Sequence, residues 1–128
     1  MLEDRIVRWI MVVSGILTCT MLYPVVSPHE ALLKNFGTTY TGPSVEVVVR
    51  NWGALIVISG LFVIYAASRP ALRAAALLVS GTGEVVFIAL TLLYARPLPD
   101  GPLGVAVAVD SVIVVLYALC LASRRRAA

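Results

Sequence analysis

The sequence predicts an all-α integral membrane protein, in which four membrane-spanning helices form a single bundle over residues 1–128. Apolar residues make up 60% of the chain and Asp, Glu, Lys and Arg only 13%, against about 45–50% and about 25% in an average soluble domain. The mean hydropathy is +0.96. A soluble globular domain or a disordered chain would need far more polar surface than this. Both classes are therefore excluded.

The first apolar run covers residues 6–26, which is close to the ~20 residues that a membrane helix needs. Arg8 lies one turn from its start, where a long side chain can reach the headgroups. Glu3 and Asp4 precede the run, and no A-x-A cleavage site follows it. We therefore expect an uncleaved span rather than a signal peptide.

Residues 27–44 form the only long connection and are predicted to lie outside the membrane. Pro28, Gly37, Gly42 and Pro43 interrupt regular structure there, while residues 29–36 can form a short interfacial helix. His29 lies in this connection beside Glu30. We expect it to be a solvated loop residue rather than a catalyst.

Three more apolar runs complete the bundle, and they cover residues 45–67, 71–95 and 103–123. Short proline-containing turns separate them. Cys19 and Cys120 lie inside apolar runs without CxxC spacing, which indicates neither a disulfide framework nor a metal site. We expect two free thiols and no cofactor.

The basic residues predict the orientation. Those on the side of the two termini are Arg5, Arg8, Arg69, Arg73, Arg124, Arg125 and Arg126, and those on the other side are Lys34 and Arg96. Basic residues flanking membrane helices concentrate in the cytoplasm. Both termini are therefore expected to be cytoplasmic, and the net charge of +3 indicates orientation in the bilayer rather than a nucleic-acid partner.

Four charged residues, Glu46, Arg50, Glu84 and Asp110, lie within the apolar runs. A charge near the bilayer centre costs at least ~2.5–3.5 kcal/mol, so each needs a physical reason. With a rise of ~1.5 Å per residue, all four fall in the outer half of the membrane or at its middle. Their shared depth predicts a polar cluster inside the bundle.

Glu46 and Arg50 are four residues apart with the acid first, which favours an ion pair on one helix face. Arg50 can alternatively reach across to Glu84 or Asp110, but one cation cannot neutralise three carboxylates. At least one of Glu84 and Asp110 is therefore expected to be protonated or to hold a cation. A purely structural polar network is the other interpretation.

The segment Glu46-Val-Val-Val-Arg50-Asn51-Trp52-Gly53-Ala54, followed by Gly60 in the same run, resembles the start of the second span in small uncharacterised bacterial four-span proteins of the DoxX-like group. The resemblance covers about a third of the chain. It implies a four-helix fold in the bacterial inner (plasma) membrane and supplies no activity. Glu84 departs from the pattern, because a histidine or a neutral residue is expected there.

Three functions fit these residues. The first is binding of a small cationic or amphipathic ligand, coupled or not to a proton, in an outward-opening acidic pocket. The second is an intramembrane acid–base enzyme, an isomerase or cyclase of a lipophilic substrate, with Glu84 and Asp110 as candidate catalytic groups. The third is an accessory subunit whose charges only pair within the fold. The candidate ligand-binding residues are Glu46, Arg50, Asn51, Trp52, Glu84 and Asp110. The bilayer is the expected partner, and a homodimer is compatible with four helices.

Overall fold

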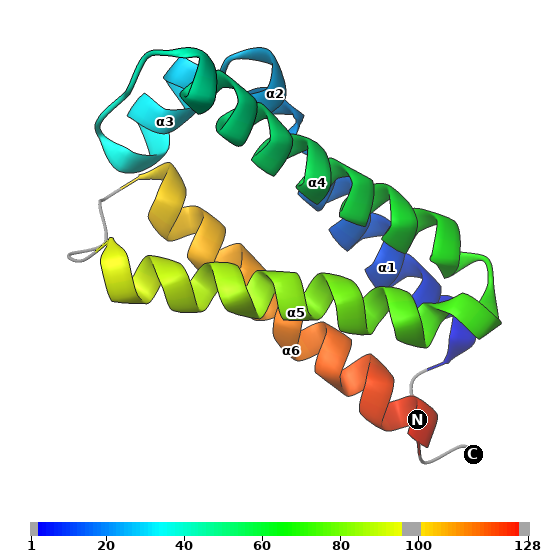
Figure 1. Ribbon diagram of the computed structural model, residues 1–128. Helices are drawn as coiled ribbons and strands as arrows, with labels where there is room; N and C mark the ends of the chain where they lie inside the picture. Colours follow the sequence, from blue (N-terminus) through cyan, green and yellow to red (C-terminus); the bar gives the residue numbers. More distant parts are fainter. Residues whose placement is uncertain (1–2, 96–100, 126–128) are drawn as a thin grey trace.

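The computed structural model describes residues 3–95 and 101–125, and this part of the chain is helical with no strand. Its helices are α1 (Asp4–Cys19), α2 (Leu22–Val26), α3 (Pro28–Phe36), α4 (Pro43–Ala67), α5 (Pro70–Tyr94) and α6 (Pro102–Arg125) (Figure 1). The predicted all-α class is confirmed. Arg96 and Arg126, which entered the count of basic residues, lie outside the described residues.

Four helical segments are long and apolar enough to cross a membrane. They cover Asp4–Val26, Pro43–Ala67, Pro70–Tyr94 and Pro102–Arg124, each within a few residues of a predicted span. The chain is therefore a multi-pass membrane protein by the length and composition of its helices. The short helix predicted over 29–36 is also present, as α3.

The first span is broken between α1 and α2, which a single apolar run did not predict. Pro24 has no N–H to donate and its ring crowds the carbonyl of the residue four positions earlier, Thr20. The Thr20 hydroxyl instead donates to the Leu17 carbonyl oxygen at 2.6 Å, and such bonds bend helices. The bend leaves the last carbonyls of α2 available to other donors.

The helices associate in two pairs. α1 packs along α4, and α5 packs along α6, while α4 and α5 are joined by the short turn at Ser68 and Arg69. Figure 1 shows the two pairs meeting at the end that carries both termini and diverging towards the end that carries α3. We call these the terminal end and the loop end of the bundle.

The buried apolar core lies near the terminal end. Its members come from the start of α1 and α5 and from the end of α4 and α6, and they are Val7, Met11, Val63, Ala66, Ala67, Ala76, Leu77, Ile113, Tyr117 and Cys120. Arg73 adjoins this core and is 5% exposed. Its guanidinium donates to the Ala67 carbonyl oxygen at 3.0 Å and 2.7 Å and to the Asp4 carboxylate. This arginine therefore ties α1, α4 and α5 together.

Glycines bring the backbones of α1 and α4 into contact. A Cβ added to Gly60 would lie 2.8 Å from the Gly15 carbonyl oxygen and 3.0 Å from the Cys19 sulfur, and one added to Gly15 would lie 2.8 Å from the Gly60 carbonyl oxygen. Small residues permit such close packing of membrane helices. Cys19 and Cys120 are both free thiols, as the sequence predicted.

Candidate functional site

The six predicted site residues form two separate groups. Glu46, Arg50, Asn51 and Trp52 lie in the first part of α4, at the loop end. Glu84 and Asp110 lie in the middle of α5 and in the first half of α6. The predicted single cluster is thus divided.

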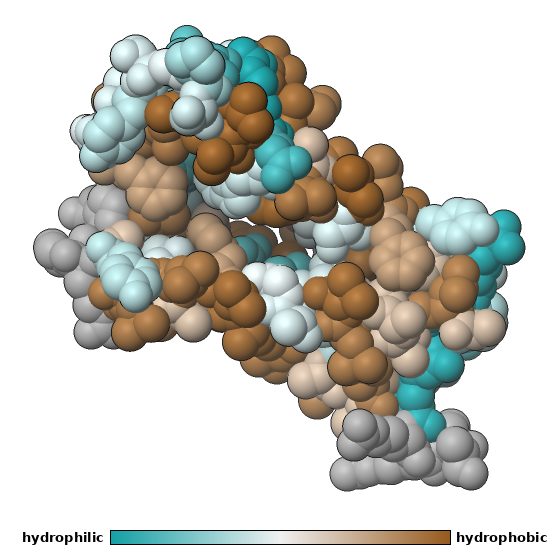
Figure 2. Space-filling view, in the orientation of Figure 1, coloured by the Kyte–Doolittle hydropathy of each residue, from teal (hydrophilic) through white to brown (hydrophobic). Residues whose placement is uncertain are grey.

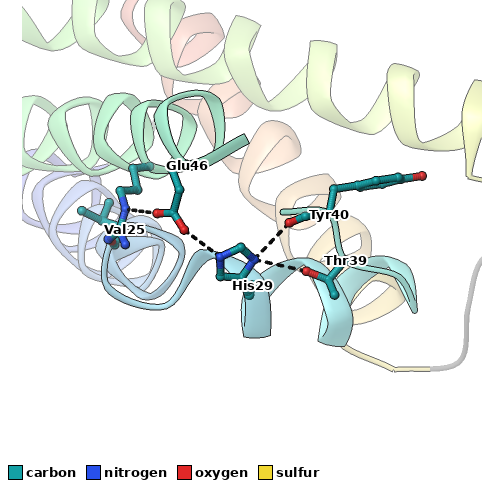
Figure 3. A network of polar contacts seen from close by, with 6 residues as sticks. Val25, His29, Thr39, Tyr40 and Glu46 are labelled. Atoms are coloured by element: carbon teal, nitrogen blue, oxygen red, sulfur yellow. Dashed lines mark hydrogen bonds and ion pairs between the residues drawn. The ribbon is translucent and has the colours of Figure 1, made fainter. Parts of the chain in front are cut away.

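The loop-end group is a network of paired charges (Figure 3). Arg50 Nε donates to Glu46 Oε2 at 2.8 Å, which confirms the ion pair predicted within this helix. Arg50 Nη1 also donates to the Val25 carbonyl oxygen, one of those at the end of α2. His29 Nε2 lies 2.6 Å from Glu46 Oε1. Two groups of Arg50, Nε and Nη1, are therefore bound at this end.

His29 is a member of this network that the sequence interpretation missed. Its Nδ1 lies 3.0 Å from the Tyr40 carbonyl oxygen and 3.4 Å from the Thr39 hydroxyl. The imidazole thus connects α3, the segment that follows it and α4 (Figure 3). A lone histidine in a connection carries no periodic signal, so only the return of α3 onto α4 could have indicated this contact.

Asn51 and Trp52 do not approach the buried carboxylates. Asn51 is exposed and Trp52 is half-buried. The Trp52 ring packs on Phe36 of α3, with 6.5 Å between ring centroids. Trp52 therefore helps to hold α3 on α4.

Glu84 occupies the packed face of α5. It lies seven residues from both Leu77 and Thr91, and this spacing returns to the same face of a helix. Leu77 is 1% exposed and Thr91 is 5% exposed. Both carboxylate oxygens of Glu84 are inaccessible to solvent and have no hydrogen-bond partner. Among the described residues, Glu84 is the one whose buried side-chain oxygens lack a partner.

Asp110 holds the equivalent place on α6, seven residues from both Leu103 and Tyr117. Each of these two neighbours is 2% exposed. Asp110 lies close enough to Glu84 for the two carboxylates to interact electrostatically. The structure therefore brings together the two carboxyl groups that the sequence left without a dedicated partner.

Polar side chains line the terminal side of Glu84. Ser80 lies close to both Glu84 and Tyr117. The Tyr117 hydroxyl is 2.8 Å from Ser14 Oγ, and Ser14 donates to the Met11 carbonyl oxygen at 3.2 Å. Because Ser14 has one proton and gives it to Met11, the shared proton with Tyr117 belongs to the tyrosine. Tyr117 and Ser14 are thus satisfied within this chain.

No described cation pairs with Glu84 or Asp110. The ion pairs in the described residues are His29 with Glu46, Arg50 with Glu46, and Arg73 with Asp4. The hypothesis that Arg50 offsets the buried carboxylates is therefore wrong, because its guanidinium is held at the loop end by Glu46 and by the α2 carbonyl. A buried ionised carboxylate without a partner is strongly unfavourable.

A separate shallow groove of about 290 Å³ lies between α3 and α4. It is lined by Leu32, Tyr40, Ser44, Val45, Val48 and Val49. None of these side chains carries a formal charge. Among the described residues no group of three or more His, Cys, Asp and Glu side chains could hold a metal ion.

No protein-family model matches this chain, and neither a curated protein nor a solved structure does. Among the described residues, Glu84 and Asp110 therefore form the candidate site. A carboxylate pair of this kind can take up a proton or a cation, and the two Glu84 oxygens are the buried side-chain oxygens without a hydrogen-bond partner in the described bundle.

Proposed function

We propose that this membrane protein binds a small lipophilic or amphipathic cation, with Glu84 as the main counter-ion and Asp110 beside it. The observation that carries the proposal is the Glu84 carboxylate, whose two oxygens are buried and accept no hydrogen bond. An intramembrane carboxyl group of this kind is costly, and such groups are typically functional.

Two species can neutralise this carboxylate, namely a proton and a bound cation. Asp110 adds a second negative charge nearby, so a single cation between α5 and α6 relieves the repulsion of both groups. A cation and a proton compete for the same oxygens. Binding is therefore coupled to proton release and weakens as the pH falls.

The test uses tetraphenylphosphonium, a lipophilic cation, in equilibrium dialysis against the purified protein in detergent. We expect saturable binding to the wild type at neutral pH, weaker binding at acidic pH, and no saturable binding to Glu84→Gln. Glu84→Gln keeps the shape of the side chain and removes its charge. Asp110→Asn is expected to bind with reduced affinity, because it lowers the negative charge of the site.

The matched control is Glu30→Gln. Glu30 is also a glutamate, but its carboxylate accepts a hydrogen bond from the Tyr23 hydroxyl at 2.6 Å in a solvent-exposed position. This variant should bind the cation as the wild type does. Equal binding by the wild type and Glu84→Gln, or absence of binding by both, would contradict the proposal and leave the carboxylates with a structural role.

We also propose that the protein lies in a bacterial inner membrane with both termini in the cytoplasm, as the basic residues indicate. Arg5→Cys and Tyr40→Cys, each in a background with Cys19→Ala and Cys120→Ala, test the orientation in intact cells. A membrane-impermeant maleimide should label position 40 from outside, because Tyr40 is 64% exposed. Position 5 should react only after the cells are opened. The reverse pattern would contradict the orientation.

A further inference from the structure

The contact between α4 and α5 is closed at the terminal end and open towards the loop end. On α5, Ala76 is 0% exposed, whereas Gly83, seven residues later on the same face, has nothing within 4 Å of an added Cβ. On α4, Val63 is 0% exposed, whereas Ile56 is only half-buried. Figure 2 shows the hollow that results between α4 and α5, with teal (hydrophilic) as well as brown (hydrophobic) residues inside it.

The loop end itself is covered by α3. This helix contacts both α4 and α6, and Ala31 in its first turns is 0% exposed. His29 and Trp52 fasten it to α4. Tyr23 of α2 donates to Glu30, and Lys34 donates to the Tyr23 hydroxyl at 3.0 Å. The hydrogen bond to Tyr23 raises the pKa of Lys34, so its charge is retained in this contact.

We propose that the ligand of the Glu84 site enters sideways from the lipid phase, between α4 and α5, rather than from the water at the loop end. Glu84 directly follows Gly83, so it lies at the same level of α5 as the opening, on the adjoining helix face about 100° away. Apolar residues dominate both helices. The route therefore selects molecules that combine a positive charge with an apolar body. This inference rests on the proposed function.

Two carbodiimides distinguish the routes, because both convert a protonated carboxyl group into a stable N-acylurea. Dicyclohexylcarbodiimide partitions into the bilayer, and ethyl-dimethylaminopropyl carbodiimide is a water-soluble cation. The protein in phosphatidylcholine vesicles is treated with each, and mass spectrometry of its peptides measures the modification of Glu84. We expect modification by the lipophilic reagent and about tenfold slower modification by the water-soluble one.

A Cβ at position 83 meets no neighbouring atom, so a large side chain can be accommodated there. Gly83→Trp should fill the opening and slow the modification of Glu84 by the lipophilic reagent about tenfold. Val85→Trp is the matched control on the same helix, because Val85 is 49% exposed and lies about 200° around the helix from Gly83. It should react at the wild-type rate. If Gly83→Trp does not fold, Gly83→Leu replaces it. Because leucine is a smaller obstacle, the rate of modification should then lie between that of the wild type and that expected for Gly83→Trp.

Equal rates for the two reagents, or equal rates for Gly83→Trp and Val85→Trp, would overturn the sideways route. The proposed function fails separately. Tetraphenylphosphonium can fail to bind and fail to protect Glu84 from the lipophilic reagent while Gly83→Trp still slows the reaction. In that case the sideways route is supported and cation binding at Glu84 is contradicted. Protection by the cation together with slow reaction of Gly83→Trp supports both.

Discussion

Replacing Arg73 with alanine should lower the free energy of unfolding in detergent by about 3 kcal/mol, as expected for the loss of hydrogen bonds from a charged donor. Arg73 is 5% exposed and gives two hydrogen bonds to the Ala67 carbonyl oxygen at the end of α4. Without it, that carbonyl group loses its donor and α1 loses its link to α5. The Asp4 partner is 75% exposed, so water compensates much of that contact.

Thermal melts in one detergent measure this effect, with Arg69→Ala as the control. Arg69 is an exposed arginine four residues away whose guanidinium carbon lies 4.3 Å from the centre of the Tyr65 ring. Its removal should lower Tm far less. Asp4→Asn should also be mild, because water replaces the lost contact. Similar melting of Arg73→Ala and Arg69→Ala would show that the buried guanidinium does not hold the helices together.

Gly60→Ala should destabilise the protein by about 1–3 kcal/mol, the usual cost of overpacking a close contact. The new Cβ would lie 2.8 Å from the Gly15 carbonyl oxygen. That atom belongs to the backbone of α1 and cannot turn aside, so the two helices must separate. Gly60→Leu should be more damaging, since its longer side chain has no space between α1 and α4.

Gly83→Ala is the control, and we expect it to change the stability in the opposite direction to Gly60→Ala. A Cβ at Gly83 meets nothing within 4 Å, and alanine in a helix is favoured over glycine by up to about 1 kcal/mol. This variant should therefore melt at or above the wild-type Tm. If Gly60→Ala and Gly83→Ala change Tm alike, helix propensity rather than contact between α1 and α4 determines the stability.

The sequence was sufficient to predict the four spans, the short helix α3 and the pair formed by Glu46 and Arg50, because each depends on the spacing of residues within one segment. The break at Thr20 was missed. Hydropathy does not register that Pro24 removes a backbone donor and crowds a carbonyl.

Contacts between segments were harder to predict. Depth alone placed Arg50 beside Glu84 and Asp110, since residues at one level of the membrane can lie on different faces of their helices. The spacing of seven residues that puts Glu84 between Leu77 and Thr91, and Asp110 between Leu103 and Tyr117, was present in the sequence.

Because the main apolar core lies at the terminal end, a small rotation of α5 about that core produces a larger displacement at the loop end. Helix α5 has 25 residues, which makes it about 37 Å long, and beyond Ser80 only Thr91 is buried. Tyr94 lies about 26 Å beyond Leu77, the last core residue of α5, so a tilt of about 5° around the core would move that end by about 2 Å. The core contacts near the pivot would move only by a fraction of that distance. The widest molecule admitted between α4 and α5 would then depend on the angle between the two helices as well as on the side chains along them.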